Sequence, residues 1–214
     1  AARLAEAGHK VALTARGEHL KALKQSGLIV DYADEKRFRH VLPAYSHKEL
    51  LDSCQAGDFD LIIISLKSTA TKEAADTPLL SLQNGVDNEP LIASVIGEGR
   101  VIGGLAVRIG GHILKPGHVV AEGAAEIVMG PWPMTGISDP RAPFVEQLCR
   151  AFNAAGIPAT VSDNIRYELW RKLVINNGVN PLSALTRLDT RSLTQHPQFR
   201  HVVFGMMSET VEAS

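Results

Sequence analysis

The strongest constraint on the fold is a short apolar run rich in isoleucine, from Phe59 to Leu66 (FDLIIISL). A run of this length without polar alternation is typical of a parallel strand that is buried on both faces. The first residues supply the order of elements that parallel strands need. Residues 1–8 are strong helix formers, residues 9–16 (HKVALTAR) alternate as a strand does, and residues 18–25 are helical again. This pattern predicts an α/β fold.

Composition narrows the class of protein. The chain has 214 residues, 22 Lys and Arg against 23 Asp and Glu, and 45% hydrophobic residues. These values argue against disorder and give no sign of a nucleic-acid partner, which requires clustered Lys and Arg. The longest apolar run is far shorter than the ~20 residues of a membrane span. Two cysteines without a CxxC pattern fit a reducing compartment, so we expect a cytoplasmic protein with no membrane partner.

A second apolar strand is predicted at Leu79–Leu82, followed by the sequence Gln-Asn-Gly. Ligands of open α/β sheets bind at the carboxyl ends of strands. Lys67 follows the first strand and Asn84 follows the second, so both are candidate site residues. An Asn-Gly turn also occurs without any ligand, which is the alternative for Asn84.

The connection between these two strands is short. Residues 68–78 have to supply the whole crossover, and a crossover with its helix needs at least ~10–12 residues. Either residues are absent near Ala74 to Asp76, or the crossover helix is genuinely shortened.

The sequence after residue 100 changes character. Short strands joined by Gly-rich turns are predicted between Val101 and Gly130, as antiparallel edge strands added to the sheet. An amphipathic helix is predicted at Pro143–Ala155, with Val145, Leu148 and Phe152 on one face, and a last strand at Ile157–Val161.

The next segment, IRYELWRKLVINNGVNPLSALT, begins a long helix for which Ser162 or Asp163 is the expected N-cap. Spacings of four residues place three polar side chains on one stripe of this helix: Lys172, Asn176 and Asn180. A solvated helix face would have the same pattern. Alternatively, Gly178 ends the first helix, and Asn180-Pro181 begins another as its N-cap and first residue.

Three stretches of the chain resemble the ketopantoate reductase (2-dehydropantoate 2-reductase) family: ARLAEAGHKVALTARGEHLKAL, SLQNGVDNEP and LWRKLVINNGVNPLSAL. The resemblance implies a Rossmann-type NADP-binding domain over residues 1–161. It implies the start of an all-helical substrate and dimerisation domain over residues 162–214, of the 6-phosphogluconate-dehydrogenase-like kind. In the family a strand and a G-x-G-x-x-G turn precede the position of Ala1, and further helices follow that of Ser214.

The resemblance also implies roles for the candidate residues. Lys172 matches the catalytic acid, and Asn176 and Asn180 match substrate-binding residues. Asn84 matches an Asn beside the nicotinamide and the substrate, and Lys67 lies on the cofactor side of the crevice. Arg16 ends the second strand of a dinucleotide fold, where Arg suits the 2′-phosphate of NADP. A solvated surface Arg is the alternative.

The function implied by the resemblance is the NADPH-dependent reduction of 2-dehydropantoate to pantoate, in pantothenate and coenzyme A biosynthesis. A related 2-keto acid dehydrogenase of the same fold, such as a mandelate-type enzyme, is one alternative. A non-catalytic dinucleotide-binding sensor is another. The eight histidines show no HExxH spacing, so no metal is predicted. A homodimer formed through the helical domain is compatible with the sequence.

Overall fold

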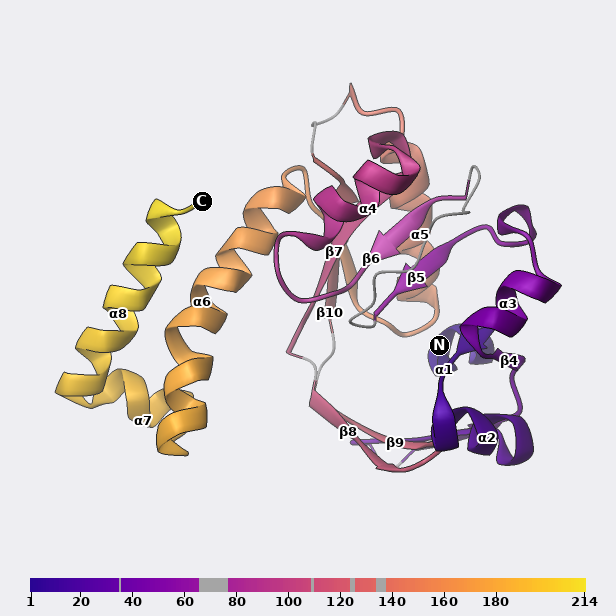
Figure 1. Cartoon of the computed structure of the whole chain (residues 1–214), viewed down its shortest axis with the longest axis horizontal. Helices are drawn as coiled ribbons and strands as arrows, with labels where there is room; N and C mark the ends of the chain where they lie inside the picture. The colour runs from indigo at the N-terminus through magenta and orange to yellow at the C-terminus, as the bar shows by residue number, and fades with distance from the viewer. Residues whose placement is uncertain (35, 66–76, 109, 124–125, 134–137) are drawn as a thin grey trace.

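The computed structural model describes the chain except residues 35, 66–76, 109, 124–125 and 134–137. A mixed part built of strands and helices comes first, and an all-helical part follows (Figure 1). In the described residues, no helix is both long enough and apolar enough to cross a membrane.

The main sheet has five strands in the order β11-β10-β7-β6-β5. β5, β6 and β7 run parallel, β10 runs antiparallel to β7, and β11 runs parallel to β10. Their bounds are β5 Ile62–Ile64, β6 Leu79–Ser81, β7 Val101–Val107, β10 Glu126–Pro131 and β11 Ala159–Val161.

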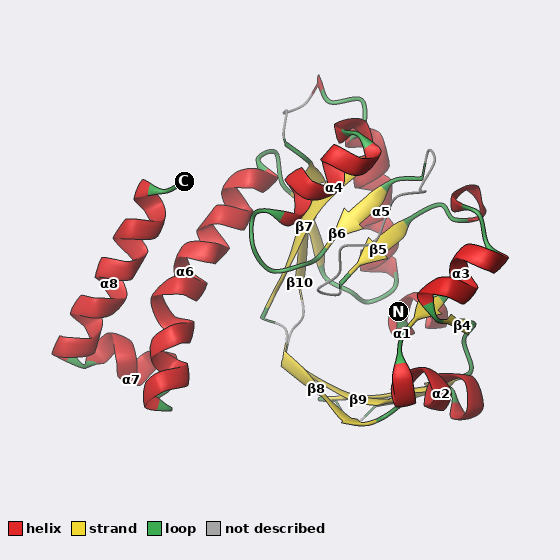
Figure 2. Ribbon diagram, in the orientation of Figure 1, coloured by secondary structure: helices red, strands yellow, loops and turns green. Residues whose placement is uncertain are grey.

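The two faces of the main sheet are covered by different helices (Figure 2). Helix α5 (Ala142–Ala154) packs against the face that includes Leu80, and helix α4 (Asn88–Ile96) packs against the face that includes Leu79. Neighbouring residues of a strand point to opposite faces, so this division follows from the strand geometry. The predicted apolar face of α5 is confirmed, because its buried residues are Val145, Leu148 and Phe152.

The predicted helix, strand and helix of the first residues are confirmed as α1 (Ala2–Glu6), β1 (Leu13–Thr14) and α2 (Gly17–Ser26). Strand β1 pairs in parallel with β4 (Ala44–Tyr45) in a separate two-stranded sheet. Helix α3 (His47–Ser53) follows β4, and the 3₁₀ helix η1 spans Ala56–Asp58. A capping box starts α3, in which Ser46 accepts from the Glu49 amide and Glu49 accepts from the Ser46 amide.

A four-stranded sheet in the order β3-β2-β9-β8 corrects the prediction for residues 101–130. We expected all of these strands at the edge of the main sheet. Instead, β7 and β10 lie inside it, whereas β9 pairs with a strand from near residues 28–32 and β8 pairs with β9. Strand patterns in a sequence are local, whereas the choice of partner depends on contacts between distant segments. The bounds are β2 Leu28–Tyr32, β3 Arg37–His40, β8 Gly110–Lys115 and β9 His118–Glu122.

This second sheet contains a cluster of polar contacts centred on Asp31. Arg37 Nε lies 2.5 Å from one carboxylate oxygen, and His118 Nε2 lies 2.7 Å from the other. These two hydrogen bonds hold the pKa of Asp31 at about 2. The Asp31 carboxylate therefore joins β2, β3 and β9 through its contacts with Arg37 and His118.

The prediction for the isoleucine-rich run is only partly correct. β5 is an end strand of the five-stranded sheet, and Ile63 is 37% exposed, so the strand is not buried on both faces. Its predicted end at Leu66, together with Lys67 and the short connection near Ala74 to Asp76, lies outside the described residues.

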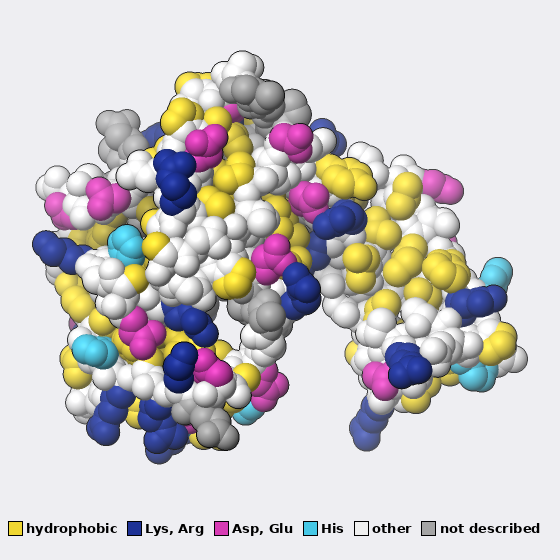
Figure 3. All heavy atoms as spheres, turned by 180° about the vertical axis from the view of Figure 1, so that it is seen from behind, with side chains coloured by type: hydrophobic (Ala, Val, Ile, Leu, Met, Phe, Trp, Pro, Cys, Tyr) yellow, Lys and Arg dark blue, Asp and Glu magenta, His cyan; other side chains and the backbone are white. Residues whose placement is uncertain are grey.

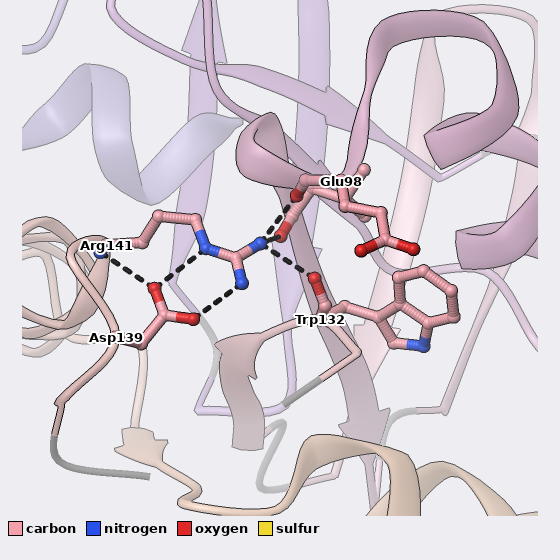
Figure 4. A network of polar contacts seen from close by, with 5 residues as sticks. Glu98, Trp132, Asp139 and Arg141 are labelled. Atoms are coloured by element: carbon pink, nitrogen blue, oxygen red, sulfur yellow. Dashed lines mark hydrogen bonds and ion pairs between the residues drawn. The ribbon is translucent and has the colours of Figure 1, made fainter. Parts of the chain in front are cut away.

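Arg141 ties the start of α5 to the end of the sheet where β7 begins (Figure 4). Its Nη1 donates to the carbonyl oxygens of Glu98, Val101 and Trp132 at 2.6, 2.8 and 2.7 Å. Its Nε and Nη2 donate to the two carboxylate oxygens of Asp139, which is buried. A planar guanidinium with several fixed donors suits such a junction of chain segments.

The helical part consists of α6 (Ile165–Thr186), α7 (Thr190–Gln195) and α8 (Pro197–Glu212). Its small core contains Val179, Leu193 and Val203. Other apolar side chains of α6 and α8 are exposed, and Figure 3 shows hydrophobic side chains gathered on the helical lobe. These exposed residues include Ile175, Leu185, Val202, Phe204 and Val211.

Helix α6 differs from the prediction at its start, and its length excludes one alternative. The N-cap is Asn164, whose side chain accepts from the Tyr167 amide, rather than Ser162 or Asp163. The helix then runs without interruption for 22 residues, through Gly178 and with Pro181 inside it. The alternative of two helices is therefore wrong, and the spacing of the polar stripe is that of one helix.

Gly178 is where α6 and α8 approach each other closely. A β-carbon at this position would lie 2.6 Å from Cγ of Met207, closer than real contacts allow. A side chain at Gly178 would therefore force the Met207 side chain, or the helix that carries it, to shift.

We expect Gly178→Ala to lower the free energy of unfolding by about 1 kcal/mol, because overpacking outweighs the gain in helix propensity. Gly205→Ala in α8 is the matched control, because a β-carbon there has no neighbour within 4 Å. It should raise stability by up to about 1 kcal/mol. Chemical denaturation of both variants measures the difference, and equal effects would contradict the close packing.

Candidate active site

The ammonium group of Lys172 connects the helical part to the strand-containing part. Lys172 Nζ donates to Asn84 Oδ1 at 2.9 Å and to the carbonyl oxygen of Ala106 at 2.8 Å. Asn84 follows β6, and Ala106 is near the end of β7, the parallel neighbour of β6. The ammonium group therefore lies at the carboxyl ends of two adjacent parallel strands, where ligands of such sheets bind.

The first two turns of α6 fix Lys172 in this place. Ile165 and Leu169 are buried, and they pack with Leu105 of β7 and with Val86 from the segment after Asn84. Lys172 lies one turn beyond Leu169 and is half-buried. The apolar side of the helix therefore packs on the sheet, and the Lys172 ammonium group lies at the edge of this apolar contact.

Burial lowers the pKa of Lys172 below its usual value of 10.5. The cause is desolvation, which disfavours the charged form of an amine. An ammonium group has three N–H donors, and two of them are used by Asn84 and Ala106. The third has no acceptor among the described residues. It can donate to a ligand, and an amine with a lowered pKa gives up its proton more readily.

The turn that carries Asn84 is held by its own neighbours. Asn88 donates from Nδ2 to the carbonyl oxygen of Asn84 at 2.9 Å. Gly85 adopts a φ of +105°, which glycine reaches without a steric cost. The Asn84 side chain is thereby presented to Lys172 with its amide nitrogen still available.

The other two residues of the predicted stripe are less engaged. Asn176 is half-buried and Asn180 is exposed, and neither side chain makes a hydrogen bond to another residue in the described part of the chain. They lie one and two turns beyond Lys172 on the same helix. The structure therefore brings Lys172 and Asn84 into contact, whereas the side chains of Asn176 and Asn180 have no partner among the described residues.

Arg16 lies where the sequence placed it, after the end of β1 and at the N-cap position of α2. Its side chain is exposed. Lys67, the other candidate on the cofactor side, lies outside the described residues.

Sequence reasoning missed the Ala106 carbonyl oxygen as a partner of Lys172. Every residue has such an oxygen, so no residue type marks it. It also missed the burial of Glu89 in the first turn of α4, although Glu89, Ile92 and Ile96 have the spacing of one helix face. No group of three or more His, Cys, Asp and Glu residues that could hold a metal ion occurs among the described residues.

The lowered pKa of Lys172 has a measurable consequence. The neutral amine is the form that acylating reagents attack, so Lys172 should react at a lower pH than an ordinary lysine. Labelling with acetic anhydride over a pH series, read out by peptide mass spectrometry, gives the midpoint for this residue. A midpoint at or above 10.5 would contradict the desolvated position.

Comparisons with protein-family models and with curated proteins show which family the chain resembles. The model described as "Ketopantoate reductase PanE/ApbA" matches residues 1–134, and the model for its C-terminal part matches residues 164–214. The 2-dehydropantoate 2-reductase of Pyrococcus horikoshii is 29% identical over 96% of this chain and 66% of its own length. That of Aquifex aeolicus is 31% identical over 70% of this chain and 50% of its own length. The chain thus spans between half and two thirds of these relatives.

Solved structures agree on the fold. The 2-dehydropantoate 2-reductase of Geobacter metallireducens has a TM-score of 0.82 at 26% identity, over 99% of this chain and 69% of that one. A D-mandelate dehydrogenase with NADH and anilino(oxo)acetate has a TM-score of 0.84 at 22% identity, over 98% of this chain and 67% of that one. The predicted Rossmann-type fold with a helical C-terminal part is confirmed. With family models matching both of its parts, this chain belongs to the ketopantoate reductase family.

Proposed function

We propose that the protein reduces 2-dehydropantoate to pantoate with NADPH. The observation that carries this proposal is the Lys172 ammonium group, which is half-buried and hydrogen-bonded to Asn84 and Ala106 at the ends of two parallel strands. Proteins named 2-dehydropantoate 2-reductase that align with most of this chain support the choice of substrate. The proposal includes a cytoplasmic role in pantothenate and coenzyme A biosynthesis.

The residues present fit a dinucleotide at two places. An exposed guanidinium at the end of β1, that of Arg16, suits the 2′-phosphate of the adenosine ribose. Asn84 follows the end of β6 and suits the nicotinamide side. When bound, the nicotinamide supplies a hydride for the keto carbon. We infer NADP rather than NAD from the Arg at the ribose position, since Asp or Glu there would favour NAD.

Lys172 acts as the proton donor in this proposal. Its third N–H donates a hydrogen bond to the keto oxygen, and the positive charge stabilises the alkoxide as it develops. The proton then moves from Nζ to that oxygen, which completes the hydroxyl group and leaves a neutral amine. Burial supports this transfer, because it lowers the pKa of Lys172. Solvent returns the proton after the product has left.

The amide side chains supply orientation without adding charge. Asn84 uses Oδ1 to hold Lys172 and can donate from Nδ2 to the substrate. Asn176 and Asn180 extend the same stripe of α6 and can bind the hydroxyl and carboxylate groups of the substrate. Holding the carbonyl in a fixed orientation lowers the entropic part of the barrier.

We further propose a domain boundary between residues 161 and 162, with β11 ending the dinucleotide domain and α6 opening the helical one. The exposed apolar side chains of α6 and α8 support a homodimer through the helical domain.

Replacing the proton donor tests the activity directly. In the full-length protein, Lys172→Ala should lower kcat with 2-dehydropantoate by about 10²–10⁴-fold, as loss of a general acid does, and leave the Kd for NADPH nearly unchanged. Arg171→Ala is the control, because Arg171 is an exposed neighbour that pairs with Glu168. NADPH oxidation with a panel of 2-keto acids gives the rates. An equal loss of turnover and NADPH affinity would contradict the acid role, and another preferred keto acid would overturn the substrate.

Arg16 tests the choice of cofactor. Arg16→Ala should weaken NADPH binding by roughly tenfold, the effect of losing one charge-assisted phosphate contact, and leave NADH binding unchanged. Lys21→Ala, on the following turn of α2 and paired with Glu18, is the control. Titration calorimetry measures both nucleotides. If NADPH and NADH lose affinity equally, Arg16 does not contact the 2′-phosphate.

A further inference from the structure

A carboxyl group lies in the apolar core beneath the turn that presents Asn84. Glu89 is 0% exposed, and in α4 it shares the core-facing side with Ile92 and Ile96. A fully buried glutamate is rare unless it has a charged partner or a metal, because an unpaired charge in the core is costly. The role proposed for the active site does not use this group.

The surroundings of Glu89 hold polar neighbours but no described countercharge. Ser81, the last residue of β6, is also 0% exposed, and its hydroxyl is near enough to favour the charged carboxylate. However, neither Ser81 Oγ nor either carboxyl oxygen of Glu89 makes a well-formed hydrogen bond to a described residue. Burial is the larger effect and raises the pKa of Glu89.

The ionisable groups on the neighbouring elements do not alter this balance. α4 packs against β7 and the 3₁₀ helix η2 (Glu98–Arg100). Neither β6 nor β7 contains an ionisable side chain, and on η2 Arg100 donates to the carbonyl oxygen of Ile96 at the far end of α4. Asp87, just before α4, and Glu98 of η2 are both exposed. Among the described residues, burial outweighs the effect of the Ser81 hydroxyl, so the balance favours the uncharged form of Glu89.

The position of Glu89 links it to the candidate active site. Ser81 and Glu89 stand at the two ends of the segment 82–88, one at the end of β6 and the other in the first turn of α4. Asn84 lies in this segment and accepts the hydrogen bond from Lys172. Any displacement of the start of α4 relative to the end of β6 moves the Asn84 side chain.

We propose that Glu89 is a positioning residue, which as an uncharged acid in the core holds the Asn84 turn in the geometry that receives Lys172. This inference rests on the proposed function and deepens its account of the same site. A protonated carboxyl group both donates and accepts hydrogen bonds, as an amide does. Ionisation leaves an unpaired charge in the core, which shifts the start of α4 and with it Asn84.

Two variants of Glu89 and one control separate positioning from general stability. Glu89→Gln keeps the shape and the uncharged state, whereas Glu89→Ala removes the group. Ile96→Ala removes buried volume from the same face of α4, about two turns further from Asn84. In the full-length protein, Glu89→Ala should lower kcat/KM by roughly tenfold, the effect of losing the hydrogen bond between Asn84 and Lys172, and Glu89→Gln should stay within about twofold of wild type.

The Ile96→Ala control shows whether a loss of kcat/KM comes from general destabilisation. Ile96→Ala should lower the melting temperature but keep the kcat/KM of the folded protein. If Glu89→Ala behaves like Ile96→Ala, Glu89 is merely structural. If Glu89→Gln loses as much kcat/KM as Glu89→Ala, an uncharged group does not suffice and the proposal is wrong.

A pH series tests the uncharged state without any assay of catalysis. Because the pKa of Glu89 is raised in the folded protein, its contribution to stability is complete below the unfolded value near 4.5 and is lost as the pH rises through the folded value. The melting temperature of wild type should therefore fall relative to Glu89→Gln as the pH rises. The NMR signal of the Asn84 side-chain amide should shift over the same range in wild type, and this part of the shift should be missing in Glu89→Gln, which keeps only the shift caused by titration of Lys172.

The proposal would be overturned if the melting temperatures of wild type and Glu89→Gln changed with pH in the same way. An Asn84 signal that shifts with pH equally in the two proteins would also overturn it. If no form of the protein reduces a 2-keto acid, the proposed function fails, and these two pH measurements still decide whether Glu89 is uncharged and whether it controls the Asn84 turn.

Discussion

The two hydrogen bonds of Lys172 are the contacts on which the architecture of the site depends. They reach from the first long helix of the helical part to the ends of β6 and β7, and they hold a desolvated ammonium group in place. Desolvation would be costly for a cation without acceptors, so the Asn84 side chain and the Ala106 carbonyl oxygen are necessary partners. The turn after β6 and the packing of Ile165 and Leu169 serve to bring these partners together.

Local sequence patterns predicted correctly those features that depend on a single helix or strand. The apolar face of α5 and the order of α1, β1 and α2 follow from spacing and propensity. The stripe of Lys172, Asn176 and Asn180 needed one more fact, that α6 continues through Gly178 and Pro181. Both residues usually interrupt helices, but here Gly178 permits the close approach of Met207, and packing outweighs helix propensity.

Other features could not be predicted because they depend on distant segments. The pairing of β9 with β2 joins strands about ninety residues apart, and no local pattern encodes it. The carbonyl oxygen of Ala106 carries no signature in the sequence. Glutamate is usually a surface residue, so its residue type gave no reason to place Glu89 in the core. Its burial is visible only in the folded structure.

The uninterrupted course of α6 has a mechanical consequence. The helix is about 33 Å long at 1.5 Å per residue, with its first turns anchored on the sheet and Val179 anchored in the helical core. No break in the helix separates these anchors, so one continuous helix carries both Lys172 and the helical core. A change in the angle between α6 and the sheet would therefore move Lys172 relative to Asn84 and Ala106.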